Sequence, residues 1–419
     1  MKILHTSDWH LGRTLHGHLL FEAQEAAVNH IVDEAIRLGV NVVVIAGDVY
    51  DRPTPPSESM RLLNSAIERL DAAGVALLLT AGNHDSADRL ATYSGILKPS
   101  IRIAGSVKDL TRPLELEDEH GAVLIYPVTY LHPEVASYEL ASDLAQPLTR
   151  THESVMEAAI ERIREDIDRR KSEAGHNLRT VAVAHAFVGS KSGTKTDRQE
   201  TGTGLQDAGM EVSESERDLS IGGIQIVPSS VFDGFDYVAF GHLHGQQNVP
   251  MPKGSTTLAR YSGSLLRYSM SERNHTKSFT IIDLQAPGVA PTAKFTVHEI
   301  PQPRGMARIQ GTMDQLLSLK FEAQRFDYVE VTVTDTKYPE SMYARIKETF
   351  PYLLNLIYNP EGKAVGSGAA GVGMDARKLS PMEAMSIFFD QASGVPLTDK
   401  ANTVLQKALD EAAKKLGVN

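Results

Sequence analysis

The 419-residue sequence contains no cysteine, and it has fewer basic than acidic residues. The absence of cysteine excludes disulfide bonds, thiolate metal ligands and cysteine nucleophiles. The 42 Lys and Arg against 53 Asp and Glu give a formal net charge of −11. That balance disfavours a protein that binds nucleic acid over its whole surface. It is compatible with a local basic groove, or with a bound cation that reverses the sign at one site.

Long hydrophobic runs are missing as well. No apolar run approaches the roughly 20 residues that a membrane span requires. The first residues, MKILHTSDWHLG, lack the apolar stretch and small-residue cleavage site of a signal peptide. We therefore expect a cytoplasmic protein with no membrane segment. The length exceeds one ordinary domain and 42% of the residues are hydrophobic, so two or three globular units are expected.

The first part of the chain alternates strand and helix patterns. Apolar runs in KILHTS, VNVVVIAGD and VALLLTAGN predict buried strands. Residues 22–38 and 57–73 have helical periodicity, and each stretch ends before a glycine. Further strands are predicted at AVLIYP, TVAVAHAFV and FDYVAFGHLHG, with a long helix from Thr151 and a polar loop over 189–223. This alternation predicts an α/β fold.

The character of the sequence changes beyond about residue 286. We expect a first domain over 1–285 and a small α+β domain over 286–360, with a helix near 342–350 between DYVEVTVTDT and LLNLIY. The Gly- and Ala-rich stretch 361–379 predicts a flexible linker. Two short helices are expected over 380–419, the first with Ser380 as N-cap and Glu383 completing a capping box.

Polar side chains follow five of the expected strands. They are Asp8 and His10, Asp48 and Asp51, Asn83 with His84 and Asp85, His185, and His242 with His244. Because ligands bind at the carboxyl ends of strands in open α/β sheets, these side chains should converge. The Asp-x-His and His-x-His spacings would put both members of each pair on one side of an extended segment. Carboxylate, imidazole and amide groups suit a pair of Mn²⁺-like ions and disfavour structural zinc.

Each motif taken alone has an ordinary explanation as a turn or as a packed core histidine. Asp51 could simply brace the loop that follows it. Eight other histidines lack this context and are interpreted as surface or packing residues: His16, His18, His120, His132, His152, His176, His275 and His298. Five polar groups at the ends of buried strands, in this order, are better explained by a metal centre.

The order Asp-x-His, Gly-Asp-x-x-Asp, Gly-Asn-His-Asp, His, Gly-His-x-His resembles that of the calcineurin-like metallophosphoesterase superfamily. The stretches HTSDWHLGRTLHG, SERDLSIGG, FDYVAFGHLH and RYSGSLLRYSMSE resemble one branch, the bacterial nuclease subunits that work with an SMC-like ATPase. The resemblance implies a sandwich of β-sheets flanked by helices, a small capping domain for DNA recognition and a C-terminal helical tail.

The same resemblance implies roles for individual residues. Asp8, His10 and His244 would hold one metal, Asn83, His185 and His242 the other, and Asp48 would bridge both. His84 would be catalytic, with Asp85 orienting its imidazole. The ions would be two Mn²⁺, with Mg²⁺ as the second choice. Such ion pairs lower the pKa of a bridging water and hold a phosphodiester for in-line attack.

The activity implied is a metal-dependent exonuclease and endonuclease acting on double-stranded DNA ends and hairpins. The partners implied are DNA, a second copy of the chain, and the ATPase, in a heterotetramer. Apolar stripes on the two closing helices would either pack on the chain's own core or dock on the ATPase. A small-molecule phosphatase or cyclic-nucleotide phosphodiesterase with the same metal site, and a metal-free scaffold, are the alternatives.

Overall fold

The computed structural model describes residues 1–175, 177–190, 210–213, 226–360 and 401–407. The chain divides into a first unit, Met1–Pro303, and a second unit, Arg304–Asn419. The linker expected over 361–379 and the helix expected to begin at Ser380 lie outside the described residues. In the part of the chain that is described, no helix is both long and apolar enough to cross a membrane.

Two six-stranded sheets form the centre of the first unit. The first sheet has the order β16 (Ala293–Glu299), β15 (Ser278–Leu284), β1 (Lys2–Thr6), β4 (Val42–Ala46), β5 (Ala76–Thr80) and β6 (Ile101–Ala104). The second has the order β13 (Gln247–Asn248), β14 (Leu258–Tyr261), β12 (Tyr237–Gly241), β9 (Arg179–His185), β8 (Gly121–Val128) and β7 (Leu114–Asp118). β1, β4 and β5 run parallel, as do β8, β9 and β12.

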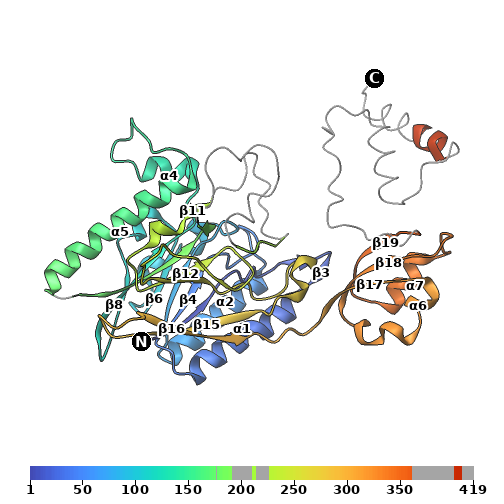
Figure 1. Ribbon diagram of the computed structural model, residues 1–419, viewed down its shortest axis with the longest axis horizontal. Helices are drawn as coiled ribbons and strands as arrows, with labels where there is room; N and C mark the ends of the chain where they lie inside the picture. The colour runs from blue at the N-terminus through green and yellow to red at the C-terminus, as the bar shows by residue number, and fades with distance from the viewer. Residues whose placement is uncertain (176, 191–209, 214–225, 361–400, 408–419) are drawn as a thin grey trace. The chain divides into compact units, whose positions relative to one another are not determined.

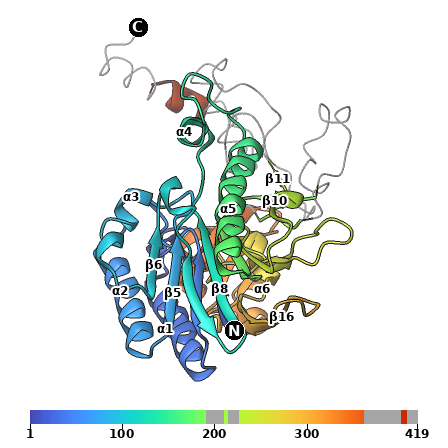
Figure 2. The ribbon, with the colours of Figure 1, turned by 90° about the vertical axis from the view of Figure 1, so that its left-hand side faces the viewer.

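The sheets pack face to face, with helices on the two outer faces (Figure 2). Side chains alternate along each strand, so that Val123 and Ile125 of β8 lie between the sheets while Leu124 and Tyr126 face the opposite way. The first sheet is covered by α1 (Phe21–Arg37) and α2 (Ser57–Ala72), as their periodicity predicts. The second sheet is covered by α5 (His152–Ala174), where Tyr126 donates a hydrogen bond to Asp166 at 2.9 Å. The predicted sandwich of sheets flanked by helices is confirmed.

Short elements connect these layers. They are β2 (Thr14–Leu15), β3 (His18–Leu19), α3 (Ala87–Leu90), α4 (Pro133–Glu139), β10 (Val188–Gly189), β11 (Val227–Pro228), and the 3-10 turns Ser94–Ile96, Val107–Asp109, Ser229–Phe232 and Met270–Asn274. The loop expected over 189–223 falls mainly on residues outside the description.

The first unit extends further than the sequence pattern indicates. Strand β16 pairs with β15 along its whole length, so residues 286–303 belong to the first unit and not to the small domain. Its side chains are mostly exposed, which leaves no apolar run to mark a strand.

The second unit contains a small parallel sheet with helices, drawn in orange in Figure 1. The strands have the order β17 (Met306–Gly311), β18 (Tyr328–Val333) and β19 (Leu353–Tyr358). The connections contain α6 (Met313–Leu316), the 3-10 segment Leu319–Gln324 and α7 (Met342–Thr349). Val329, Val331 and Val333 form a common core with Ile346 of α7. The strands expected in DYVEVTVTDT and LLNLIY, and the helix between them, are confirmed.

Candidate metal centre

The carboxyl ends of five parallel strands meet at one edge of the two sheets. Asp8 and His10 follow β1, Asp48 follows β4, and Asn83 follows β5 in the first sheet. His185 ends β9, and His242 and His244 follow β12 in the second sheet. Both sheets therefore contribute to one site, in which ligand atoms of the predicted His and Asp residues gather in groups of three that lie within 4.8 Å of one another.

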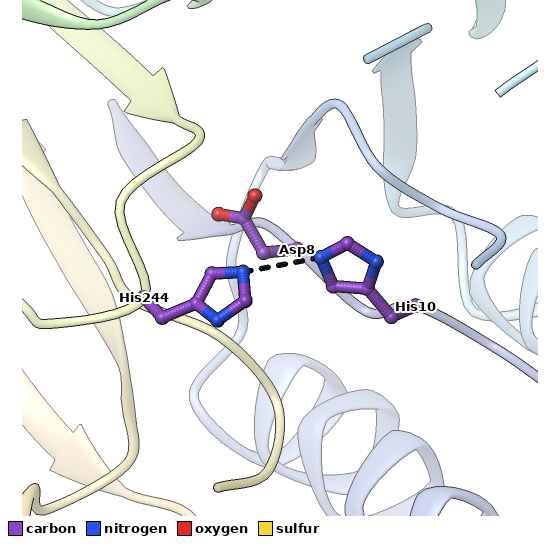
Figure 3. Close-up of side chains that lie close together, drawn as sticks. All are labelled: Asp8, His10 and His244. Carbon is purple, nitrogen blue, oxygen red and sulfur yellow. Dashed lines mark hydrogen bonds between the residues drawn. The ribbon is translucent and has the colours of Figure 1, made fainter. Parts of the chain in front are cut away.

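Asp8, His10 and His244 form the first cluster (Figure 3). The two imidazoles face each other, with 3.1 Å between His10 Nε2 and His244 Nε2. All three residues are at most 2% exposed. One carboxylate and two imidazoles directed at a common point form a donor set that suits a divalent cation.

Asn83, His185 and His242 form the second group. Asn83 Oδ1 lies 3.0 Å from His185 Nε2 and 3.2 Å from His242 Nδ1. His185 Nδ1 lies 2.8 Å from the carbonyl oxygen of Ala46, to which it donates. That bond fixes the ring and directs Nε2 toward the centre, as is usual for a histidine that binds a metal.

Asp48 lies between the two groups. Its Oδ2 is 3.6 Å from His10 Nε2 and 3.4 Å from His185 Nε2. Its Oδ1 accepts a hydrogen bond from the backbone N–H of His84 at 2.9 Å. One carboxylate within reach of both groups has the geometry expected of a bridging ligand.

The backbone at the centre is strained. Four of the candidate ligands have positive φ: Asp8 at 51°, His10 at 44°, Asp48 at 48° and His242 at 109°. Positive φ in residues other than glycine costs of order 1–3 kcal/mol each and is concentrated at functional sites. These φ values also correct one expectation, because Asp8 and His10 have left-handed backbone and do not lie on an extended segment. His242, with a φ of 109°, is not extended either.

Close packing explains the glycines that precede the ligands. A Cβ on Gly82 would lie 2.1 Å from Asp48 Oδ1, and one on Gly241 would lie 1.7 Å from the carbonyl oxygen of Ala46. No side chain fits at such distances, so glycine is required for the strand ends to approach.

Burial and mutual charge set the ionisation of the centre. Burial disfavours a charge on Asp48, but His185, together with His10 and His84, outweighs it and holds the pKa of the Asp48 carboxyl well below its usual value. Burial also opposes a charge on His185, yet Asp48 raises the pKa of its imidazole to about 9. Burial, with the charge of His185, lowers the pKa of His242 to about 3. Buried carboxylates need a compensating cation, which a metal ion would supply in place of the imidazolium proton.

His84 and Asp85 lie beside this centre, but not as expected. The Nδ1–H of His84 donates to the backbone carbonyl of Asp51 at 2.9 Å. Asp85 accepts from the backbone N–H groups of Val49, Tyr50 and Gly82 at 2.9–3.0 Å. Asp85 therefore braces the loop, and the imidazole is oriented by a main-chain carbonyl. Burial, with the charge of Asp48, raises the pKa of Asp85 to about 6.

Asp51 also contributes through its side chain. Its Oδ1 accepts from Arg13 at 3.2 Å and lies 3.7 Å from His10 Nδ1. Asp51 thus braces the loop, the alternative left open by the sequence, and also borders the first cluster.

Several residues around the centre were not expected from the sequence. Glu272 approaches His244 Nδ1 at 3.3 Å, and Gln24 donates to the carbonyl of His10 at 2.7 Å. The Tyr130 ring packs against His185 and against His152, a histidine interpreted as a surface or packing residue. These contacts join segments far apart in the sequence, and no local pattern marks them.

The comparisons agree with this geometry. The family model of the calcineurin-like phosphoesterases matches residues 1–246, which contain every candidate ligand. The chain belongs to the calcineurin-like phosphoesterase family. A model for the SbcD C-terminal domain, described as the type 5 capsule protein repressor C-terminal domain, matches residues 302–393.

A relative resembles this phosphoesterase over nearly its whole length. The SbcD subunit of the nuclease SbcCD from Staphylococcus saprophyticus is 27% identical over 415 residues, which are 98% of each chain. The resemblance to the SbcD branch is thereby confirmed, and it includes both units.

Two solved structures show weaker likeness. The protein TT1561 of Thermus thermophilus is 14% identical and a dimetal phosphatase from Danio rerio is 12% identical. Each match covers 72% of this chain and 99% of that chain, with a TM-score of 0.38. The fold assignment rests on the family model and on the sheet topology.

Proposed function

We propose that this phosphoesterase is the nuclease subunit of an SbcCD-like complex. It would hydrolyse phosphodiester bonds at the ends and hairpins of double-stranded DNA, as exonuclease and endonuclease, in cytoplasmic DNA repair, recombination and replication. The observation that supports this most is the similarity to SbcD of S. saprophyticus over 98% of both chains, joined to a buried two-group His and Asp centre. A similarity confined to the metal centre would support phosphoester hydrolysis but would not indicate the substrate.

The residues of the centre would hold two divalent cations. Asp8, His10 and His244 would bind one and Asn83, His185 and His242 the other, with Asp48 shared. A donor set of oxygen and imidazole nitrogen favours Mn²⁺, with Mg²⁺ second. When bound, such ions supply Lewis-acid polarisation of a phosphodiester and an activated water.

His84 is suited to proton transfer. Because its Nδ1–H donates to the Asp51 carbonyl, Nε2 is the atom available to a substrate. The side chain is only partly buried, so a phosphodiester can reach it. A proton on Nε2 would be donated to the leaving oxygen, where negative charge develops during hydrolysis.

The decisive assay compares substrates and one variant. Purified chain is incubated with Mn²⁺ and linear duplex DNA, hairpin DNA, or bis(4-nitrophenyl) phosphate, with and without the ATPase. We expect metal-dependent cleavage of DNA, which Asp48→Asn abolishes because both ions lose a shared ligand. Asp236→Asn is the matched control. The Asp236 carboxylate lies away from the centre and accepts a hydrogen bond of 2.7 Å from the backbone N–H of Thr180. Turnover of small esters without DNA cleavage would instead indicate a small-molecule phosphatase or phosphodiesterase.

The partner would be the SMC-like ATPase SbcC, bound by a dimer of this chain in a heterotetramer. We assign the contact to residues 380–419, most of which lie outside the described residues, because of their capping box and apolar stripes. Truncation before Ser380 should leave metal-dependent cleavage intact and remove complex formation. A pull-down that recovers the ATPase equally well with the truncated chain would refute this assignment.

A further inference from the structure

A buried ion pair lies behind one of the candidate ligands. Glu272, in the turn Met270–Asn274, and Lys277, just before β15, are 0% and 2% exposed. Lys277 Nζ donates to Glu272 Oε2 at 2.6 Å. Buried ion pairs are often no more stabilising than apolar residues of equal volume, so stability alone does not account for this one.

The pair holds both the ring and the backbone of His244. Glu272 Oε1 lies 3.3 Å from His244 Nδ1, while Lys277 Nζ donates to the His244 carbonyl at 2.9 Å. Ser264 N donates to the same carbonyl at 3.1 Å. Glu272 itself is fixed by the backbone N–H of Tyr268 at 3.2 Å and the hydroxyl of Ser269 at 3.1 Å.

This arrangement determines which ring nitrogen of His244 is directed at the metal centre as a ligand. When Nδ1–H donates to the carboxylate, Nε2 has an unshared electron pair and faces His10 Nε2 at 3.1 Å. A carboxylate behind a ligand histidine fixes its tautomer and increases its basicity. In the second group, the Nδ1–H of His185 donates to a neutral carbonyl, that of Ala46, so the two groups are supported differently.

We propose that Glu272 and Lys277 are positioning residues for the cation bound by Asp8, His10 and His244. Glu272 sets the tautomer of His244, and Lys277 ties the ligand's backbone to the same carboxylate. The inference rests on the proposed function only in taking His244 as a metal ligand.

The test is a calorimetric titration with Mn²⁺ alone on the full chain. Glu272→Gln should weaken one of the two binding events about 10–100-fold and leave the other unchanged. The double variant Glu272→Gln with Lys277→Met removes both charges, so that neither is left buried alone, and should weaken the same event. Asp118→Asn is the matched control, because the Asp118 side chain is only 6% exposed and pairs with the buried Arg179 away from the centre.

A second readout separates positioning from simple destabilisation. Cleavage by Glu272→Gln should return toward the wild-type rate as Mn²⁺ is raised, whereas a variant that is destabilised but still folded in the assay would gain nothing beyond the control. Wild-type Mn²⁺ affinity in the folded double variant, or equal weakening in Asp118→Asn, overturns the inference. If the wild type binds two Mn²⁺ and cleaves no DNA, the proposed function fails while the predicted loss of affinity still supports the positioning role.

Discussion

Replacement of His84 by alanine tests whether this residue performs chemistry or holds metal. His84 lies close enough to His10 and Asp48 for all three to share an ion. Its ring packs edge-on against the ring of His10, with 4.7 Å between the two ring centroids. We interpret it as a proton donor outside the ligand set. His84→Ala should therefore slow DNA cleavage severely while the chain still binds two metal ions.

The expected magnitudes differ for catalysis and for stability. General acid–base groups contribute about 10²–10⁴-fold, or roughly 3–5 kcal/mol in activation free energy. The side chain makes one hydrogen bond to the protein through Nδ1, to the carbonyl of Asp51. The loss of such a bond lowers the free energy of unfolding by only about 0.5–1.5 kcal/mol. Activity should thus fall far more than stability.

The assay measures single-turnover cleavage of duplex DNA, Mn²⁺ content and urea denaturation on the same preparations. His30→Ala is a suitable control, because His30 is also partly buried and its Nε2 bonds to the carbonyl of Glu299 at 3.3 Å. The control should lose similar stability and no activity. One bound Mn²⁺ instead of two in His84→Ala would place His84 among the ligands and refute the reasoning.

Two further predictions concern packing and pH. Gly82→Ala would put a Cβ 2.1 Å from Asp48 Oδ1. The substitution should therefore displace that carboxylate and abolish both Mn²⁺ binding and cleavage. Gly95→Ala is the control, and it should change neither because Gly95 has open space around it. Burial, with the charge of Arg260, lowers the pKa of His5 to about 3, so His5 stays neutral in the folded chain while it is protonated in the unfolded chain below pH 6.5. The free energy of unfolding is therefore unaffected by His5 above pH 6.5 and decreases as the pH falls toward 3. The decrease is about 2 kcal/mol at pH 5. His5→Gln should lack this part of the acid dependence in denaturation measured from pH 7 to pH 5, and an unchanged slope would contradict it.

The parts of the fold that the sequence predicts well are those with complete burial. Every residue of β4 and of β5 is buried, because each strand is central in its sheet and covered on both faces. Such strands appear as unbroken apolar runs. Strand β16 is at the edge of the same sheet with Phe295 and Val297 partly exposed, so its sequence KFTVHE gives no such signal. The proline and glycine residues before it instead suggest a domain boundary, and the pairing of β16 with β15 shows that the first unit continues past it.

The candidate site is predictable in its residue types and less so in its geometry. Strand order and ligand chemistry indicate that Asp8, Asp48 and His185 should meet, since their strands end at one edge. The sequence pattern does not show that Asp8 and Asp48 adopt positive φ, which depends on tight packing between segments. The family resemblance implies that Asp85 orients His84, whereas the structure has the main-chain carbonyl of Asp51 in that role, and residue types do not reveal a main-chain partner.

The atom through which a histidine binds is the least predictable feature, and it depends on distant residues. His185 and His244 both direct Nε2 into the centre, but the first is set by the carbonyl of Ala46 and the second by Glu272. His242 instead approaches Asn83 through Nδ1. The Gly-His-x-His motif therefore specifies two imidazoles without specifying which nitrogen each presents. That choice is made by side chains and carbonyls that the fold brings behind each ring, so variants of these supporting groups should alter metal affinity without any change in the ligands themselves.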